Sequence, residues 1–351
     1  MSVKWMKNSH SHTWMEKTRT RGWRLGHEME MSIKWMEDVQ MTGTDRACAV
    51  HRPLMPNVSL GISPINWINN DMNDLGDNYS VDAVLADMRD MGFVGTEWCR
   101  KFPTEAHLLR PLLDTYGITL AGAWKTVQFS TGVNFEQELQ DFRQYARFLK
   151  EMGSDYVVVC DGGGSLHWDN PGPRRQVVPY DDTAWIRLAE GLNQAGQYAN
   201  ELGMKLAYHP HVGTNVERPE AIARLLAATD AEVVSIVYDT GHIYAGGGDP
   251  LRILERHAHR LACVHLKDVR QDALSRFRER GGTFIEAVRD GLFTVPGDGC
   301  IDFRPILKVL SERNYQGWMM IEAEQDPQQA EPRTYAEKAM QYLQSCMQTM
   351  R

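Results

Sequence analysis

Eight short apolar runs, separated by segments with helical signals, make up the chain from residue 57 onward. The helical segments are bounded by capping residues, for example Ser80 before and Gly92 after the first of them. Parallel strands need long crossover connections, and eight such strand and helix units close a sheet on itself. The sequence therefore predicts a (β/α)8 barrel. Its expected strands are residues 58–65, 93–98, 118–125, 155–160, 205–209, 233–239, 261–266 and 317–322.

The alternative architecture is an open, doubly wound parallel sheet. Sheets of that kind that bind dinucleotides carry a G-x-G-x-x-G turn after the first strand, and this sequence lacks it there. Acidic residues and histidines at predicted strand ends are instead spread over the second half of the chain. Because α/β barrels of roughly 250 residues form one domain, we expect a single barrel domain over residues 56–351.

Residues 1–55 differ in kind from the rest of the chain. They contain eight of the 18 Met and four of the 10 Trp, and they show neither a helical nor a strand periodicity. We expect a poorly ordered N-terminal extension that is not part of the barrel core. An interaction arm is the alternative, and an upstream translation start, with Met55 as the natural beginning, would explain such an extension.

Four predicted strands in the second half of the chain end in histidine, aspartate or glutamate. A buried strand needs no charge at its end, so such residues point to a functional site rather than to packing. In a barrel all these ends face one mouth. Imidazole and carboxylate together suit Mn²⁺, Co²⁺, Fe²⁺ or Zn²⁺ better than Ca²⁺. The expected ligands of one divalent ion are Asp239, His265, Glu322 and either His209 or His211.

Further polar residues at or just after strand ends are candidates for contact with a substrate or a leaving group. The structural alternative for His242 is that it is a plain turn residue. The structural alternative for Lys267 is an ion pair with its neighbour Asp268. The candidates are Glu97, Lys125, His242 and Lys267.

Charge and composition restrict the expected partners. The formal net charge is −8 and no continuous Lys/Arg run occurs, so nucleic acid is not expected as a partner. No apolar stretch approaches the ~18 residues of a membrane span, and the N-terminus lacks the apolar core of a signal peptide. Six scattered cysteines without a C-x-x-C pair fit reduced thiols in the cytoplasm. We expect a small neutral or metal-chelated substrate, and a homo-oligomer stays open.

Six motifs between residues 58 and 350 resemble those of the sugar isomerase/epimerase (xylose isomerase-like) superfamily of metal-dependent TIM barrels. Together they resemble more narrowly the dehydratases of 2-keto-myo-inositol (scyllo-inosose) in inositol catabolism, whereas YDTGH alone would identify only the superfamily. The motifs are GISPINW at 61–67, HPHVGT at 209–214, YDTGH at 238–242, VHLKDV at 264–269, FTVPGDG with IDF within 293–303, and the segment 318–327.

The resemblance implies a metal held by Glu, Asp, His and Glu from the fifth to the eighth strand. This sequence departs from that pattern at the fifth strand, where His-Pro-His replaces the Glu. The ligands after the sixth, seventh and eighth strands carry over, and Mn²⁺ or Co²⁺ is the expected ion. The fifth-strand ligand stays open between His209 and His211, with Glu217 and Glu97 as substitutes.

The resemblance also implies loss of water from 2-keto-myo-inositol to give a trihydroxycyclohexane-1,2-dione. A metal at the ketone stabilises the charge that develops there, a general base removes the adjacent proton, and an acid assists the departing hydroxyl. Glu322 is expected to serve as ligand and base together, with His242 and Lys267 facing substrate. A keto-sugar isomerase or epimerase is the alternative enzyme, and a non-catalytic sugar-binding barrel is the alternative outside enzymes.

Overall fold

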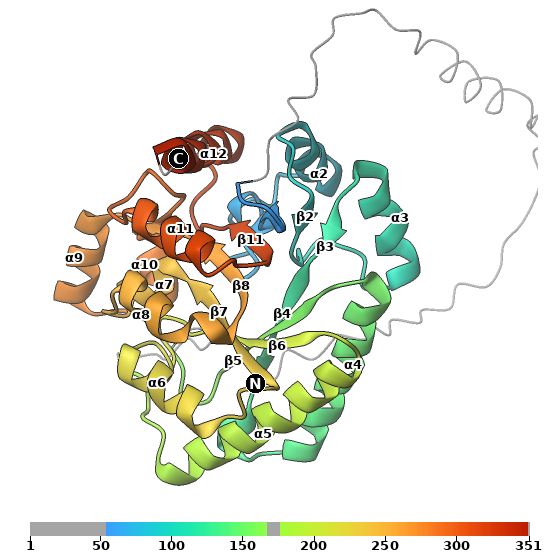
Figure 1. Cartoon of the computed structure of the whole chain (residues 1–351), viewed down its shortest axis with the longest axis vertical. Helices are drawn as coiled ribbons and strands as arrows, with labels where there is room; N and C mark the ends of the chain where they lie inside the picture. The colour runs from blue at the N-terminus through green and yellow to red at the C-terminus, as the bar shows by residue number, and fades with distance from the viewer. Residues whose placement is uncertain (1–53, 167–175, 350–351) are drawn as a thin grey trace, which may run out of the picture. The chain divides into compact units, whose positions relative to one another are not determined.

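The computed structural model describes residues 54–166 and 176–349 (Figure 1). The predicted N-terminal extension lies outside these residues except for Leu54 and Met55. Both of these side chains are buried against the main hydrophobic core.

A parallel sheet forms the centre of the described chain, in the order β3-β2-β1-β11-β8-β7-β6-β5-β4. Its two ends meet, because β3 and β4 are separated only by Ala121, whose N–H donates to Thr96 and whose carbonyl accepts from Asp155. The sheet therefore closes, which confirms the predicted barrel. The strands are β1 (Val58–Ile62), β2 (Gly95–Thr96), β3 (Thr119–Leu120), β4 (Gly122–Val127), β5 (Tyr156–Asp161), β6 (Lys205–Tyr208), β7 (Val234–Asp239), β8 (Leu261–Leu266) and β11 (Gly317–Ile321).

Helices surround the sheet (Figure 1) and pack their apolar faces against it. Their ends follow the capping signals of the sequence: the Ser80 hydroxyl accepts from the Ala83 N–H, and Gly117 ends a helix in the left-handed conformation. The α-helices are α2 (Val81–Asp90), α3 (Ala106–Tyr116), α4 (Phe135–Met152), α5 (Asp182–Glu201), α6 (Pro219–Ala228), α7 (Thr240–Ala245), α8 (Pro250–His257), α9 (Gln271–Arg280), α10 (Phe284–Arg289), α11 (Phe303–Glu312) and α12 (Pro332–Thr349). Short 3-10 helices cover Pro64–Asn66, Phe129–Thr131 and Ala258–Arg260.

Large side chains fill the inside of the barrel because glycine stands beside them on nearby strands. A Cβ atom at Gly95 would lie 2.2 Å from the Trp318 ring, and one at Gly122 would lie 2.2 Å from the Tyr156 ring. Real Cβ atoms do not approach other atoms so closely, so these glycines are required by the two rings. Tyr156 thereby extends across the interior below the strand ends.

Two differences from the predicted elements affect the mouth of the barrel. The expected helix over 273–290 is divided into α9 and α10, because Gly281 and Gly282 have φ angles of 63° and 155°. A short antiparallel pair, β9 (Asp268–Val269) with β10 (Phe293–Thr294), was not predicted. Together they bring residues 284–294 over the C-terminal ends of β7 and β8, where they contact the candidate site.

Candidate metal centre

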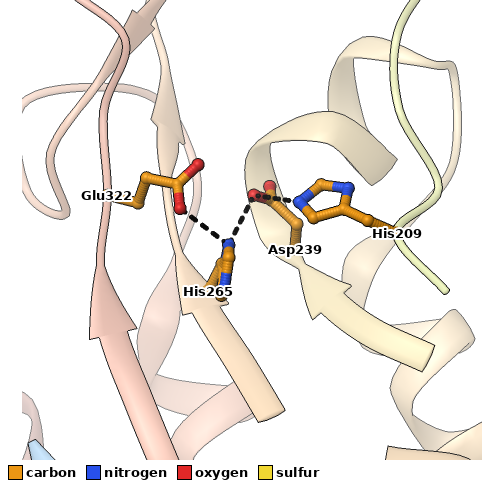
Figure 2. A group of neighbouring side chains, drawn as sticks. All are labelled: His209, Asp239, His265 and Glu322. Carbon is orange, nitrogen blue, oxygen red and sulfur yellow. Dashed lines mark ion pairs between the residues drawn. The ribbon is translucent and has the colours of Figure 1, made fainter. Parts of the chain in front are cut away.

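Four polar side chains from neighbouring strand ends converge at the C-terminal mouth of the barrel (Figure 2). They belong to consecutive strands of the sheet, in the order β11-β8-β7-β6. Every one of them is at least nine-tenths buried. The four residues are His209, Asp239, His265 and Glu322.

The ligand atoms of these residues face one another. His209 Nε2 lies 3.5 Å and His265 Nδ1 lies 3.7 Å from Asp239 Oδ2, and His265 Nδ1 lies 2.8 Å from Glu322 Oε2. One potential ligand atom from each residue lies within 4.8 Å of all the others. This separation suits side chains around one shared ion with bonds of about 2.0–2.2 Å.

The hydrogen bonds of the site support this interpretation. Among the described residues, the buried atoms Asp239 Oδ2 and His265 Nδ1 have no hydrogen-bond partner of acceptable geometry, despite the close approach of Glu322. Unpaired buried polar atoms are costly and rare unless something else satisfies them. His209 Nδ1 lies 2.9 Å from the Pro210 carbonyl, so it carries the proton and leaves the Nε2 lone pair directed at Asp239. The residues therefore fit a divalent ion.

Lys267 places a permanent positive charge beside these carboxylates. Its fully buried Nζ lies 2.7 Å from Glu322 Oε1, 2.7 Å from Glu324 Oε2 and 3.3 Å from Asp239 Oδ2. Burial opposes its charge, but the three carboxylates raise the pKa of Lys267 above its ordinary value, so the amine stays protonated. Burial alone would raise the pKa values of Asp239 and Glu322, but Lys267 and the neighbouring histidines lower them. As a result, the pKa of Asp239 is below its usual value and that of Glu322 is well below its usual value.

A second buried group, His211, His242 and Glu324, lies next to the first. The His211 and His242 ring centroids are 3.7 Å apart, and His242 Nε2 lies 3.6 Å from Glu324 Oε1. The Val212 N–H donates to His242 Nδ1, so the proton of the neutral ring sits on Nε2 and faces Glu324. A metal ligand needs a lone pair at that nitrogen. This group is therefore better arranged to move protons than to bind a metal.

Glu324 is a buried carboxylate that can hold a proton near neutral pH. Burial raises its pKa to about 7, with Lys267 opposing and Glu322 reinforcing that shift. Its neighbour His211 donates from Nδ1 to the Val212 carbonyl at 2.9 Å, so the neutral ring carries its lone pair at Nε2. The second group thus contains a candidate proton donor and a candidate proton acceptor.

Three other predicted residues lie elsewhere. Lys125 does not reach the mouth. Its neighbour Trp124 packs with the residues inside the barrel, so the alternation of side chains along the strand turns Lys125 outward. There its charge lowers the pKa of Glu138 on α4, against the larger opposing effect of burial. This corrects its expected contact with substrate. Glu217 accepts a hydrogen bond from the Gly213 N–H. Glu97 contacts the far side of His265.

Several residues of the site were not predicted. Glu324 had a signal, because it stands two positions after Glu322 and an extended chain turns such residues to the same side. Trp124 is 5.3 Å and 5.5 Å from the His209 and His211 rings between centroids. The aromatic rings around His242, from Phe284 and Phe293, had no local signal in the sequence.

Comparisons with known proteins agree with the fold. The family model described as "Xylose isomerase-like TIM barrel" matches residues 85–346. That match and the closed parallel sheet define the class of protein as a xylose isomerase-like TIM barrel. Within the part of the chain that the structure describes, no helix is both long and apolar enough to cross a membrane.

Curated relatives identify the group within that class. The inosose dehydratase of Geobacillus kaustophilus is 47% identical over 289 residues, which are 81% of this chain and 93% of the relative. The inosose dehydratase of Clostridium beijerinckii is 42% identical over 287 residues, covering 82% and 96%. The chain belongs to the inosose dehydratase family.

A solved structure extends the comparison of the fold. The IolI protein, whose structure holds a zinc atom, superposes with a TM-score of 0.57 at 18% identity, covering 82% of this chain and 96% of that one. At this identity the likeness concerns the fold alone.

Proposed function

We propose that this chain removes water from 2-keto-myo-inositol (scyllo-inosose) to give a trihydroxycyclohexane-1,2-dione, with the aid of one Mn²⁺ or Co²⁺ ion. The observation that carries the proposal is the group of four buried ligand atoms within 4.8 Å of one another, in a chain of this family. The ion would be held by His209, Asp239, His265 and Glu322. His209 is preferred over His211 because its Nε2 lone pair is directed at Asp239.

A divalent ion bound there would act as a Lewis acid and stabilise the negative charge that develops on the ketone oxygen. Lys267 adds a fixed positive charge on the same side, since its ammonium contacts Glu322 and Glu324 in a water-poor environment. Fixed charges of this kind stabilise a developing anion without reorganisation.

The proton transfers are assigned to the second group. Glu322 is a weak base, because its oxygens face Lys267 and His265 and its pKa is well below normal. His211, with a lone pair at Nε2, is a better acceptor for the proton next to the ketone. The His242 and Glu324 pair supplies the proton with which the β-hydroxyl leaves as water. Return of the first proton from His211 to this pair, whose ligand atoms lie within 4.8 Å of that of His211, restores both groups, so the reaction needs no net proton.

The test is direct incubation of 2-keto-myo-inositol with the full chain loaded with Mn²⁺ or Co²⁺. We expect the absorbance of a dione and a product lighter than the substrate by one water, and no product from chelator-treated protein. A product of the same mass as the substrate would mean that the removed proton is returned, as in an isomerase. Polyol binding without turnover in any metal-loaded form would indicate a sugar-binding barrel.

Substitution of the two histidines of the His-Pro-His motif is expected to have different effects on metal binding and on kcat. His209→Asn should release the metal, whereas His211→Asn should keep it and lower kcat by about 100- to 10,000-fold, the range of a lost acid or base. Metal content and kcat of both variants check this, with Glu255→Gln as a control because Glu255 is exposed on α8. Metal loss in His211→Asn with retention in His209→Asn would reverse the assignment.

A further inference from the structure

Glu97, which follows β2, joins His265 to a tyrosine on the opposite side of the barrel interior. Its Oε1 atom lies 3.2 Å from His265 Nε2 and accepts a hydrogen bond from the Tyr156 hydroxyl at 3.1 Å. His265 and Tyr156 are almost fully buried, and the Glu97 side chain is 11% exposed. They come from β2, β8 and β5, which are not neighbours in the sheet, so the contact spans the inside of the barrel.

The two ring nitrogens of His265 face different partners. Nδ1 points to Asp239 and Glu322, and Nε2 points to Glu97. A neutral imidazole carries one proton, so a ring that donates from Nε2 must present its lone pair at Nδ1. A carboxylate beside Nε2 accepts a hydrogen bond from the Nε2–H group. It thereby favours the tautomer with a lone pair at Nδ1, which a metal ligand at that nitrogen requires.

Tyr156 is suited to hold the Glu97 carboxylate in place. Burial raises the pKa of Tyr156 well above its ordinary value, so the phenol keeps its proton and donates. Its ring is fixed between strands, because Gly122 leaves only enough room for the ring beside it. Both donors converge on the same oxygen of Glu97.

We propose that Glu97 is a positioning residue for the metal centre, which accepts a hydrogen bond from His265 Nε2 and directs the Nδ1 lone pair toward the ion, while Tyr156 orients Glu97. This inference rests on the proposed metal centre. Glu97 is not itself a ligand of that ion, because it approaches the edge of the imidazole opposite Asp239 and Glu322. It replaces our expectation that Glu97 contacts substrate.

Binding of Mn²⁺ to the full chain, measured from the EPR signal of the free ion, tests the proposal without any turnover. Glu97→Ala removes the acceptor and should weaken Mn²⁺ binding by about 10- to 100-fold, the usual effect of losing such a partner. Glu97→Gln keeps a neutral acceptor oxygen and should recover part of that loss. Tyr156→Phe should give a smaller loss than Glu97→Ala. Glu255→Ala, at an exposed position of α8, is the matched control and should bind as the unmodified chain does.

A control for folding makes the outcome specific. Circular dichroism and melting of the metal-free variants show whether each one is folded. A folded Glu97→Ala variant that binds Mn²⁺ within about threefold of the unmodified chain, below the tenfold minimum expected, would overturn the positioning role.

Failure of this inference and failure of the metal centre can be told apart. Unchanged Mn²⁺ binding in the Glu97 variants, together with loss in Asp239→Asn and Glu322→Gln, overturns the role of Glu97 alone. Unchanged binding in all of these variants overturns the metal centre, and the role of Glu97 with it.

Discussion

Asp239→Asn and Glu322→Gln are each expected to abolish stoichiometric binding of the divalent ion and to lower kcat/KM more than about 1000-fold, equivalent to ~4 kcal/mol of transition-state stabilisation. Each change replaces a charged ligand oxygen by a weaker neutral one. Asp239→Asn is a conservative test, because Oδ1 accepts from the His242 N–H and an amide oxygen can keep that helix cap while Oδ2 is lost. Metal content after dialysis and steady-state kinetics with 2-keto-myo-inositol measure the two effects.

Asp302→Asn is the matched control for these variants. Asp302 caps α11 by accepting from the Arg304 N–H, and within the described chain it makes no contact with the four candidate ligand residues. Metal content and kcat/KM should both stay as in the unmodified chain. Retention of one ion per chain in both Asp239→Asn and Glu322→Gln would exclude the proposed ligand set.

The barrel and the candidate ligands of its later strands could be predicted because their signals are local. Short apolar runs, helix caps and a charged residue at the end of a buried strand are all readable within a few residues. The convergence of Asp239, His265 and Glu322 then follows from one geometric property, that parallel strands in a barrel end at the same mouth. The structure places all three together.

The choice between His209 and His211 could not be made from the sequence. Both follow the same strand, and their roles differ because of the direction of each ring and the carbonyl to which its Nδ1 donates. Lys125 illustrates the same limit, since adjacent residues on a strand point to opposite faces. Only the register of β4 shows that Trp124, and not Lys125, points inward.

Contacts across the barrel interior could not be predicted from the sequence either. The hydrogen bonds from His265 and Tyr156 to Glu97 join residues that are 168 and 59 positions apart. They depend on the glycines that make room for large rings and on strand order, neither of which a local pattern contains. Phe293 reaches His242 only because β10 pairs with β9 after the helical break at Gly281.

Lys267→Met is expected to lower the free energy of unfolding of the metal-free protein by about 3–5 kcal/mol, as when one partner of a buried ion pair is removed. The change leaves Asp239, Glu322 and Glu324 buried together without the ammonium that all three contact. Bound Mn²⁺ should recover part of the loss, because the ion compensates two of these carboxylates. Denaturant unfolding with and without Mn²⁺ measures both values.

Lys338→Met is the control for this variant, because Lys338 pairs with Asp298 at the surface and is half exposed. Its loss should cost no more than about 1 kcal/mol, with or without Mn²⁺. Equal destabilisation of the two lysine variants would show that Lys267 does not compensate the carboxylates.

The pH dependence of the Lys267→Met variant gives an independent check. Without the ammonium, burial and mutual repulsion raise the pKa values of Asp239 and Glu324, whereas His265 still opposes such a rise at Glu322. The folded state then binds more protons than the unfolded state, so stability falls as pH rises through this range. The difference from the unmodified chain should therefore be largest near neutral pH and shrink toward acidic pH. A difference that stays constant with pH would mean that the loss comes from packing of the lysine side chain rather than from its charge.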